Sequence, residues 1–474
     1  MTNISLIYPP FHNSIRTTLP DFIDKSEGVF PPLGIMYISS YLKKHNPGVN
    51  VQLIDSVLSG YDYARIADEV VRHGADIAGI TCWTFSLLDA LNTAREIKKR
   101  KSSVKIVFGG PHVNIYPLET MKNGFIDYVI VNDGEKAFDA LVKALEGGSG
   151  LPGVPNLYYR ENGEIKKSAV ECEETDLDSL PFPDRASTAY ADYSSILDDV
   201  SPITTLITSR GCPFRCSFCM KDGTGWRARK VESIIAEIRE CIGLGIRNFT
   251  IFDETFTANK KRTLDFCRAV IDGKLDIVWN CRSRVDTVDE EALDRLKEAG
   301  CRRVSLGVES ADETVLKRLN KNISLAQVSR VFKKARAIGM ATLADFMIAC
   351  PGETPESTKK TIDFARALNP DYVQFSLFTL LPETKLYEEA LKQGVVSRDV
   401  WAEYATAPDK DFKPPLWNIY SEEDSLKLLP YAYKRFYFRL PYILGVFKRM
   451  RSFKQFALYL KAGMGLISGL WKGK

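Results

Sequence analysis

Three cysteines in one short run are the residues of this sequence best suited to metal chemistry. Cys212, Cys216 and Cys219 have the spacing Cys-x3-Cys-x2-Cys, and every histidine of the chain lies upstream of them. Three thiolates cannot complete a tetrahedral zinc site without a fourth ligand. A cubane iron–sulfur cluster normally takes four thiolates, so three would leave one iron open to a small molecule. The alternative, buried or disulfide-bonded cysteines, is disfavoured because clustered thiols in a chain without an export signal are typically metal-binding or catalytic.

The elements that precede these cysteines predict a first α/β domain over residues 1–145. Short β-branched runs alternate there with amphipathic helical patterns, which predicts a parallel, doubly wound (Rossmann-like) sheet with ligands at the carboxyl ends of its strands. The expected strands are Ile4–Tyr8, Val51–Ile54, Ile77–Thr81, Val104–Phe108 and Tyr128–Val131. The expected helices are Leu33–Lys44, Tyr63–Arg72, Leu87–Lys99 and Glu135–Leu145.

The rest of the chain predicts a linker, a partial barrel and a helical end. Residues 146–200 are rich in Gly, Pro and acidic residues and are expected to form a linker with a small hairpin. Over 201–385, six strand–helix units predict an incomplete (β/α)6 barrel with its chemistry on the loops after the strands. Residues 386–474 are expected to be mostly helical. The expected barrel strands are Ile203–Thr208, Phe249–Phe252, Ile277–Cys281, Arg303–Gly307, Thr342–Ile348 and Tyr372–Leu377.

The cysteine run, from Ser209 to Cys219, resembles the signature of the radical S-adenosylmethionine (SAM) enzymes. The resemblance implies a [4Fe-4S] cluster on the three cysteines, with the aromatic Phe218 at the cofactor site. The open iron would bind the amino and carboxylate groups of SAM, and an electron from the cluster would cleave SAM to a 5′-deoxyadenosyl radical. Four residues at later strand ends match the superfamily's SAM-binding positions, although each could instead be a surface ion pair or a cap: Asp253, Glu254, Arg284 and Glu309.

Three short motifs in the first domain resemble a cobalamin-binding domain. The family's frame is Asp-x-His-x-x-Gly, then Ser-x-Leu, then Gly-Gly. The matching residues here are Asp55, Ser56 and Val57, then Ser86, then Gly109 and Gly110. Because Val57 stands where histidine would ligate cobalt, the resemblance implies cobalamin held without that ligand. A sheet with no cofactor is the alternative. The histidines that could still approach the corrin are His12, His45, His73 and His112.

The charge of the chain is unevenly placed. Eleven Lys or Arg and no Asp or Glu follow Asp424, whereas the rest carries 53 basic and 60 acidic residues. In 425–474 cations alternate with aromatic residues, which predicts peripheral contact with an anionic membrane surface, the alternative being a basic face packed on the body. The net acidic body disfavours a nucleic-acid partner. Without a signal peptide or an apolar run of about 18 residues, a cytoplasmic location is expected, with the tail at the inner face of the membrane.

Together these motifs resemble the cobalamin-binding radical SAM family over about residues 1–385. The resemblance implies three cofactors: a [4Fe-4S] cluster, SAM and cobalamin. It implies a methyltransferase that adds methyl to an unactivated carbon of a lipid-, isoprenoid- or tetrapyrrole-like substrate, with an electron donor of the flavodoxin or ferredoxin type. The alternatives are an oxygen-independent cyclase or oxidoreductase, such as a tetrapyrrole ring-forming enzyme, and a non-catalytic metal-binding scaffold.

Overall fold

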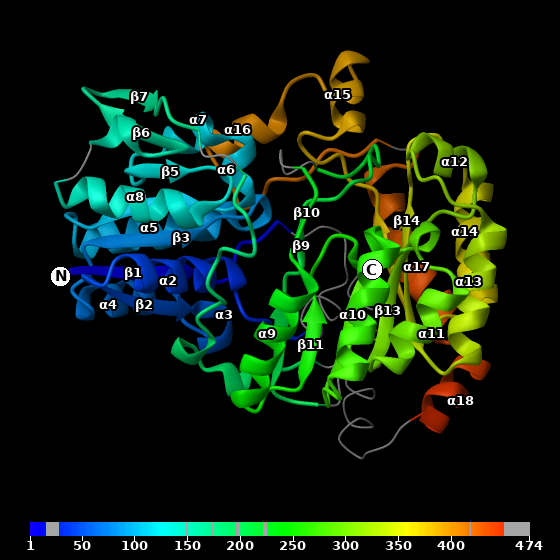
Figure 1. The fold of residues 1–474 in the computed structure, drawn as a ribbon. Coiled ribbons are helices and arrows are strands. Elements are labelled where there is room, and N and C mark those ends of the chain that lie inside the picture. Colours follow the sequence, from blue (N-terminus) through cyan, green and yellow to red (C-terminus); the bar gives the residue numbers. More distant parts are fainter. Residues whose placement is uncertain are drawn as a thin grey trace.

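Two sheets, one mostly parallel and one fully parallel, are each covered by helices and form the body of the molecule (Figure 1). The computed structural model describes residues 1–15, 28–147, 150–171, 174–195, 197, 200–220, 225–417 and 419–449. The first sheet and its helices lie at the left of Figure 1, in blue to cyan, and the second lies at the right, in green to yellow. The α/β class and the order of its two parts are therefore as predicted.

The first sheet has seven strands in the order β2-β1-β3-β4-β5-β6-β7. Its first five strands are parallel and confirm the predicted ones, while β6 and β7 form an antiparallel hairpin that pairs with β5. The hairpin expected in the linker is therefore part of this sheet. The strands are β1 (Thr2–Tyr8), β2 (Val49–Asp55), β3 (Ile77–Thr81), β4 (Lys105–Gly109), β5 (Tyr128–Ile130), β6 (Leu157–Glu161) and β7 (Glu164–Lys167).

Helices cover both faces of this sheet, because both faces of its central strands are apolar. Helices α4 and α5 pack together on one face, and α2 and α8 pack together on the other. The helices of this part are α2 (Leu33–His45), α3 (Ser56–Ser59), α4 (Tyr63–Arg72), α5 (Leu87–Arg100), α6 (Pro111–Ile115), α7 (Pro117–Met121) and α8 (Gly134–Leu145).

The second sheet has six parallel strands in the order β15-β14-β13-β12-β11-β8, so it is a barrel that stays open between its first and last strands. Its strands are β8 (Ile203–Leu206), β11 (Asn248–Ile251), β12 (Val278–Arg284), β13 (Cys301–Glu309), β14 (Ala341–Ile348) and β15 (Tyr372–Leu377). The outer helices are α9 (Val231–Gly243), α10 (Lys260–Asp272), α11 (Glu290–Glu298), α12 (Glu313–Arg318), α13 (Leu325–Ala337) and α14 (Pro355–Leu368). A two-stranded ribbon, β9 (Ser209–Arg210) with β10 (Arg227–Ala228), encloses the loop that carries the three cysteines.

The chain after the barrel returns to the first domain. Helix α15 (Lys385–Lys392) leads to α16 (Val400–Thr406), which lies beside α7 (Figure 1). Tyr116 of the first domain and Tyr387 of α15 both donate hydrogen bonds to Asp399, at 3.1 and 2.9 Å. Trp401 and Tyr404 are buried in the same core cluster as residues of α4 and α5. This segment therefore fastens the two sheets to each other.

The last described helices, α17 (Glu422–Tyr437) and α18 (Leu440–Arg449), show that part of the predicted membrane-facing run belongs to the barrel. Tyr433 and Phe436 are completely buried, and the Tyr433 hydroxyl donates to the Phe375 carbonyl and accepts from its N–H, both at 3.0 Å. The prediction that these aromatic residues face a membrane is wrong, because they close the β15 side of the barrel. Residues 450–474 of the predicted tail lie outside the described residues.

Candidate functional site

The three cysteines lie on one loop at the carboxyl end of β8. Cys212 and Cys219 are exposed, and Cys216 is half-buried. The Cys212 sulfur lies 3.7 Å from the Thr255 hydroxyl, and the Cys219 N–H donates to the Cys216 carbonyl at 3.4 Å. In the described part of the chain, no three His, Cys, Asp or Glu side chains are gathered closely enough to hold a metal ion. Cys212 and Cys219 are exposed on the same loop as Cys216, and this is the loop that would have to gather the three thiolates around a cluster.

Cationic side chains surround Cys216. The Nη1 atom of Arg284 lies 3.1 Å from the Cys216 sulfur. The hydrogen bond from Cys219 lowers the pKa of Cys216 to about 6 against the opposing effect of burial, with further help from Lys321 and Arg284. Because the thiolate is the form that binds metal, this environment prepares Cys216 for ligation.

Arg284, predicted to bind the SAM carboxylate, is held rigidly at the carboxyl end of β12. Its Nη2 and Nε atoms bond to the Asp286 carboxylate at 2.7 and 2.9 Å, and its guanidinium lies 4.0 Å from the centre of the Phe214 ring. Burial would lower the pKa of Arg284, but Asp286 and Cys216 raise it overall. A fixed planar fork of this kind, adjacent to a cluster cysteine, is well suited to bind a carboxylate.

Glu309, predicted to contact SAM, forms a buried ion pair with Lys321 at 2.8 Å. Glu309 has a left-handed backbone (φ 68°), which is strained for a residue with a side chain. A Cβ atom at Gly307 would lie 2.4 Å from the Glu309 carboxylate and 2.9 Å from the Lys321 ammonium, so only glycine fits there. Lys321 was missed by sequence reasoning because it lies in a loop with no motif of its own. Its charge influences Cys216 and Cys219.

Asp253 is placed differently from its predicted neighbour Glu254. Asp253 is 1% exposed, and its carboxylate accepts four hydrogen bonds from the backbone N–H and hydroxyl groups of Thr208 and Ser209. Burial raises the pKa of Asp253, and these hydrogen bonds oppose that shift. A carboxylate offers about four acceptor positions, and all four are used here to anchor the chain that leads into the cysteine loop. Glu254 is exposed at the same strand end.

Phe218 packs inward from the cysteine loop. It lies against the core cluster that joins the first domain to the segment after the barrel. The backbone of the preceding residue, Ser217, accepts from Leu386 N–H and donates to the Leu319 carbonyl, both at 3.0 Å. The loop is therefore tied to the barrel and to α15 between Cys216 and Cys219.

The predicted cobalamin residues occupy two different settings. Asp55 is the N-cap of α3: its carboxylate accepts from the Val57 and Leu58 N–H groups at 3.1 Å and from the Tyr193 hydroxyl at 2.8 Å. The hydroxyls of Ser56 and Ser86 are buried and have no hydrogen-bond partner among the described residues. Two buried hydroxyls without partners are rare in proteins and fit a site that awaits a polar ligand.

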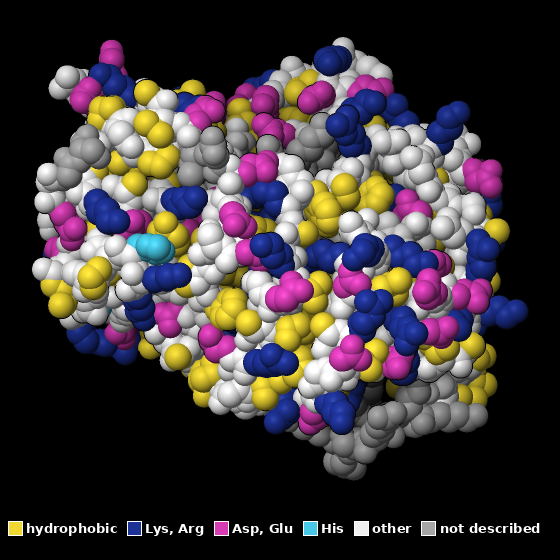
Figure 2. Space-filling view, viewed as in Figure 1, with side chains coloured by type: hydrophobic (Ala, Val, Ile, Leu, Met, Phe, Trp, Pro, Cys, Tyr) yellow, Lys and Arg dark blue, Asp and Glu magenta, His cyan; other side chains and the backbone are white. Residues whose placement is uncertain are grey.

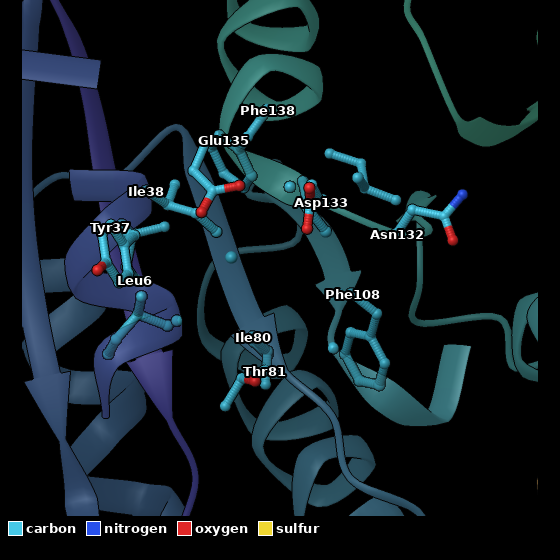
Figure 3. Close-up of a pocket in the computed structure, with 18 of the residues that line it drawn as sticks. Leu6, Tyr37, Ile38, Ile80, Thr81, Phe108, Asn132, Asp133, Glu135 and Phe138 are labelled. Carbon is cyan, nitrogen blue, oxygen red and sulfur yellow. The ribbon is translucent and has the colours of Figure 1, made fainter. Parts of the chain in front are cut away.

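A cavity of about 230 Å³ lies between the first sheet and the helices α2 and α8 (Figure 3). Gly109 and Gly110 at the end of β4 line it, whereas Asp55, Ser56, Val57 and Ser86 do not. Gly110 has φ 107°, and a Cβ atom there would lie 2.9 Å from the Cys82 carbonyl. Glycine is therefore required for this backbone path. Apolar side chains labelled in Figure 3 come from both the sheet and its helices: Leu6, Ile38, Ile80, Phe108 and Phe138.

The four histidines differ in their access to these strand ends. His112 is fully buried, which lowers its pKa to about 3, and its Nδ1 lies 3.2 Å from the Thr84 hydroxyl. His45 stacks on Tyr41, and His73 contacts the Asn50 carbonyl near the start of β2. His12 is exposed in the segment after β1. Of the four, only His12 is both exposed and at the carboxyl edge of the sheet.

Comparison with known proteins identifies both halves. The family model described as the Radical SAM superfamily matches residues 206–365, and the one described as the B12 binding domain matches residues 20–142. An uncharacterized methyltransferase of Pyrococcus horikoshii is 34% identical over 441 residues, covering 92% of each chain. The chain belongs to the cobalamin-binding radical SAM family. It is an enzyme of the methyltransferase branch of that family, whose cofactors are a [4Fe-4S] cluster, SAM and cobalamin.

More distant members of the family are similar over most of the chain. An anaerobic magnesium-protoporphyrin IX monomethyl ester cyclase of Rubrivivax gelatinosus is 27% identical, over 76% of this chain and 66% of its own. A hopanoid C-2 methylase of Rhodopseudomonas palustris is 23% identical, over 84% of this chain and 71% of its own. The solved structure of the cobalamin-dependent SAM radical enzyme OxsB has the same fold, with a TM-score of 0.73 and 18% identity, over 99% of this chain and 72% of its own.

The residues of this chain fit the family's cofactors. Three cysteines on one loop, next to Arg284 and Lys321, fit a cluster with one open iron and a bound SAM. The cavity lined by Gly109 and Gly110 fits part of a large ligand at the strand ends of the first sheet, while the unpartnered hydroxyls of Ser56 and Ser86 lie outside that cavity. Among the described residues, no helix is long and apolar enough to cross a membrane.

Proposed function

We propose that this enzyme transfers a methyl group from SAM to an unactivated carbon of a hydrophobic small molecule. One contact supports this proposal above all. Asp133, directly beyond β5 in the first domain, bonds at 2.7 Å to Arg210, two residues before Cys212. The edge at which a doubly wound sheet binds its ligand therefore adjoins the loop on which SAM would be cleaved. A methyl carrier and a radical source side by side are what methylation of such a carbon requires.

Each part of the site has a distinct task in this proposal. Cys212, Cys216 and Cys219 hold the cluster. Arg284 binds the SAM carboxylate, and the Lys321–Glu309 pair fixes the polar surroundings of the same ligand. Asp253 acts as a positioning residue through Thr208 and Ser209 rather than touching SAM. When bound, cobalamin supplies the methyl-carrier chemistry, and the chain supplies its orientation.

The hydrophobic substrate class is supported by the relatives rather than by a substrate pocket. Their printed names refer to a tetrapyrrole ester and to hopanoids, both large and mostly apolar. An electron donor of the flavodoxin or ferredoxin type belongs to the same proposal, because cleavage of SAM to methionine and a 5′-deoxyadenosyl radical consumes one electron. That radical becomes 5′-deoxyadenosine by taking a hydrogen atom from the substrate. Exposure of Cys212 and Cys219 gives such a donor access to the cluster.

The test uses the full chain, reconstituted anaerobically with iron, sulfide and cobalamin, and deuterated-methyl SAM with a reductant. A methyltransferase forms S-adenosylhomocysteine and 5′-deoxyadenosine and places the labelled methyl group on a compound from an apolar cell extract. Formation of 5′-deoxyadenosine without S-adenosylhomocysteine or label would favour a cyclase or oxidoreductase. Formation of neither product would refute the proposed reaction. The triple Cys→Ala variant at positions 212, 216 and 219 is the control for reductant-driven background.

We also propose that α18 docks on an anionic membrane surface. Leu440, Ile443 and Leu444 are 68%, 37% and 52% exposed, and Figure 2 shows hydrophobic side chains over α18 at the lower right. Eleven basic residues and no acidic residue follow Asp424, so this end of the chain complements anionic head groups. An amphipathic helix with flanking cations binds interfaces through both effects.

Point variants test this docking better than truncation, because α17 belongs to the barrel core. Vesicles of phosphatidylcholine with phosphatidylserine are floated with the full chain, and Leu440→Asp/Leu444→Asp should reduce the floated fraction. Leu118→Asp, an exposed leucine of α7, is the matched control and should float like the parent. Binding should weaken as salt is raised, since exposed charges are screened beyond a Debye length of about 10 Å at 0.1 M. The docking proposal would be refuted if the parent and all variants floated to the same extent, or if the parent did not float at all.

A further inference from the structure

One carboxylate of the first domain holds both ends of the cysteine loop. Arg210 and Arg227 are opposite each other in the β9–β10 ribbon, one just before the loop and one just after it. Nη1 of Arg210 lies 2.7 Å from Asp133 Oδ1, and Nη1 of Arg227 lies 2.7 Å from Asp133 Oδ2. Arg210 also bonds to Glu135 at 2.6 Å through its Nη2 atom. The width of the loop's base is therefore set by residues about 80 positions away in the chain.

The same side chains form a wall of the cavity in the first domain. Arg210, Asp133, Gly134 and Glu135 line that cavity together with Gly109 and Gly110. Figure 3 shows the carboxylates of Asp133 and Glu135 beside it, at the start of α8. Arg210 also lies over the ring of Tyr37, another lining residue, with 5.4 Å between guanidinium carbon and ring centre. A ligand in the cavity thus contacts the group that fixes the base of the cysteine loop.

The ion-pair network of Arg210, Asp133 and Glu135 is buried enough for its geometry to be well defined. The side chains of Arg210, Asp133 and Glu135 are 19%, 15% and 4% exposed. Burial alone would raise the pKa of Asp133, but Arg210 and Arg227 hold it below its ordinary value, so the carboxylate stays charged. Partly buried charge pairs with two or more hydrogen bonds favour one arrangement, unlike exposed pairs on long flexible side chains.

We infer that Arg210 is a positioning residue that couples ligand binding in the cavity to cluster binding by the cysteine loop. This inference rests on the proposed function, because it takes the cavity ligand to be cobalamin. A ligand that holds Asp133 and Glu135 in place also restrains Arg210, and through Arg210 it restrains the start of the cysteine loop. A cluster bound by the three cysteines restrains the same loop, and therefore also restrains Arg210. Such coupling is reciprocal: each ligand raises the affinity for the other by the same factor.

The test measures hydroxocobalamin affinity with and without the cluster, by absorbance titration under anaerobic conditions. The reconstituted full chain is compared with the cluster-free triple Cys→Ala variant at positions 212, 216 and 219. Coupling predicts at least about five-fold tighter binding with the cluster. In Arg210→Gln and in Asp133→Asn, the ratio of the hydroxocobalamin affinities with and without the cluster should approach one, while the iron content stays at the parent value. Lys260→Gln, which removes an exposed paired cation on α10, should keep the parent ratio.

A second readout separates positioning from general damage. With excess dithionite present, so that the cluster is reduced and the cobalamin is in its Co(II) form, added cobalamin should shift the electron paramagnetic resonance spectrum of the cluster in the parent but not in Arg210→Gln. If that variant fails to fold, Arg210→Lys replaces it, since lysine keeps the charge but cannot span both carboxylates. The coupling alone would be overturned if the parent bound hydroxocobalamin equally well with and without the cluster, or if Arg210→Gln kept the parent's ratio of these two affinities. If hydroxocobalamin bound neither the reconstituted parent nor the triple Cys→Ala variant, the cobalamin site would be overturned, and the coupling with it.

Discussion

Arg284 lies with its Nη1 atom 3.1 Å from the sulfur of Cys216, so the cation expected to bind SAM contacts a cysteine expected to bind the cluster. Sixty-eight residues separate the two in the chain. Asp286 and the Phe214 ring hold the guanidinium from its other sides. One rigid side chain therefore links the cluster loop to the SAM site, and its removal should affect both.

Arg284→Gln should weaken SAM binding by about 10- to 100-fold, the usual worth of a hydrogen bond to a charged group. Equilibrium binding of SAM to the reconstituted protein and the rate of 5′-deoxyadenosine formation are the measurements. Arg282→Gln is the matched control, because Arg282 lies on the same strand but is exposed, with its guanidinium over the Phe252 ring. SAM affinity unchanged in Arg284→Gln would contradict the assigned role.

Replacement of Cys212, Cys216 or Cys219 by Ala should abolish the cluster, because each supplies one of only three protein thiolates. Iron and sulfide counting after anaerobic reconstitution measures this directly. Cys241→Ala is the control: Cys241 is a buried thiol of α9 and should keep the full iron content when replaced. A triple variant that still held a cubane cluster and cleaved SAM would refute the assignment.

Lys321→Met should lower the free energy of unfolding by about 3 kcal/mol, because it leaves the Glu309 carboxylate buried without its partner. The double variant Lys321→Met/Glu309→Leu should recover much of that loss, since an apolar pair carries no unpaired charge. Denaturant unfolding of the apoprotein is the measurement, with exposed Lys317→Met as control. Equal stability of the parent and Lys321→Met would show that the pair is not as buried as the structure indicates.

Glu353 gives a pH-dependent stability. It is buried in the loop after β14, where Oε2 accepts from Cys350 N–H at 3.0 Å, and burial raises its pKa from 4.5 to about 7. The folded protein therefore binds this proton more tightly than the unfolded chain. The resulting stability is complete below about pH 4.5 and is lost as the pH rises through about 7.

Glu353→Gln should therefore be more stable than the parent above pH 7, by on the order of 3 kcal/mol, and should lack the parent's decline between the two pKa values. Denaturant unfolding at a series of pH values is the measurement. Glu356→Gln, an exposed neighbour at the start of α14, should keep the parent's pH dependence. A parent curve parallel to that of Glu353→Gln across this range would contradict the raised pKa.

Cobalamin bound to this protein should lack a histidine on its lower face, because Val57 occupies the family's ligand position. The Co(II) electron paramagnetic resonance spectrum should show no nitrogen splitting from a protein base or from the cofactor's own base. A Co(II) spectrum with nitrogen splitting would contradict this expectation. If that signal disappeared in His12→Ala, the exposed histidine after β1 would be the ligand in place of position 57.

Local patterns alone determined the elements of this fold and the order of its parts. Strand and helix periodicities of two and 3.6 residues depend only on near neighbours, so β1, β3 and β15 could be predicted almost to the residue. The spacing of Cys212, Cys216 and Cys219 was likewise visible in the chain, because all three lie on one loop. The same reasoning failed for Tyr433 and Phe436, whose alternation with cations has the pattern of a membrane-facing helix and of a barrel-covering helix alike.

Only the tertiary structure decided which distant groups meet. Lys321 approaches Cys216 because the loops after β8 and β13 lie at one end of the barrel, and no motif marks that lysine. Asp253 matches a ligand-binding position in the sequence, but packing turns its carboxylate onto Thr208 and Ser209. The bridge from Asp133 to Arg210 and Arg227 depends on how the two sheets pack against each other. The way the two sheets pack is set by surface complementarity across their whole interface. Because that interface is formed by residues far apart in the chain, no short stretch of sequence predicts it.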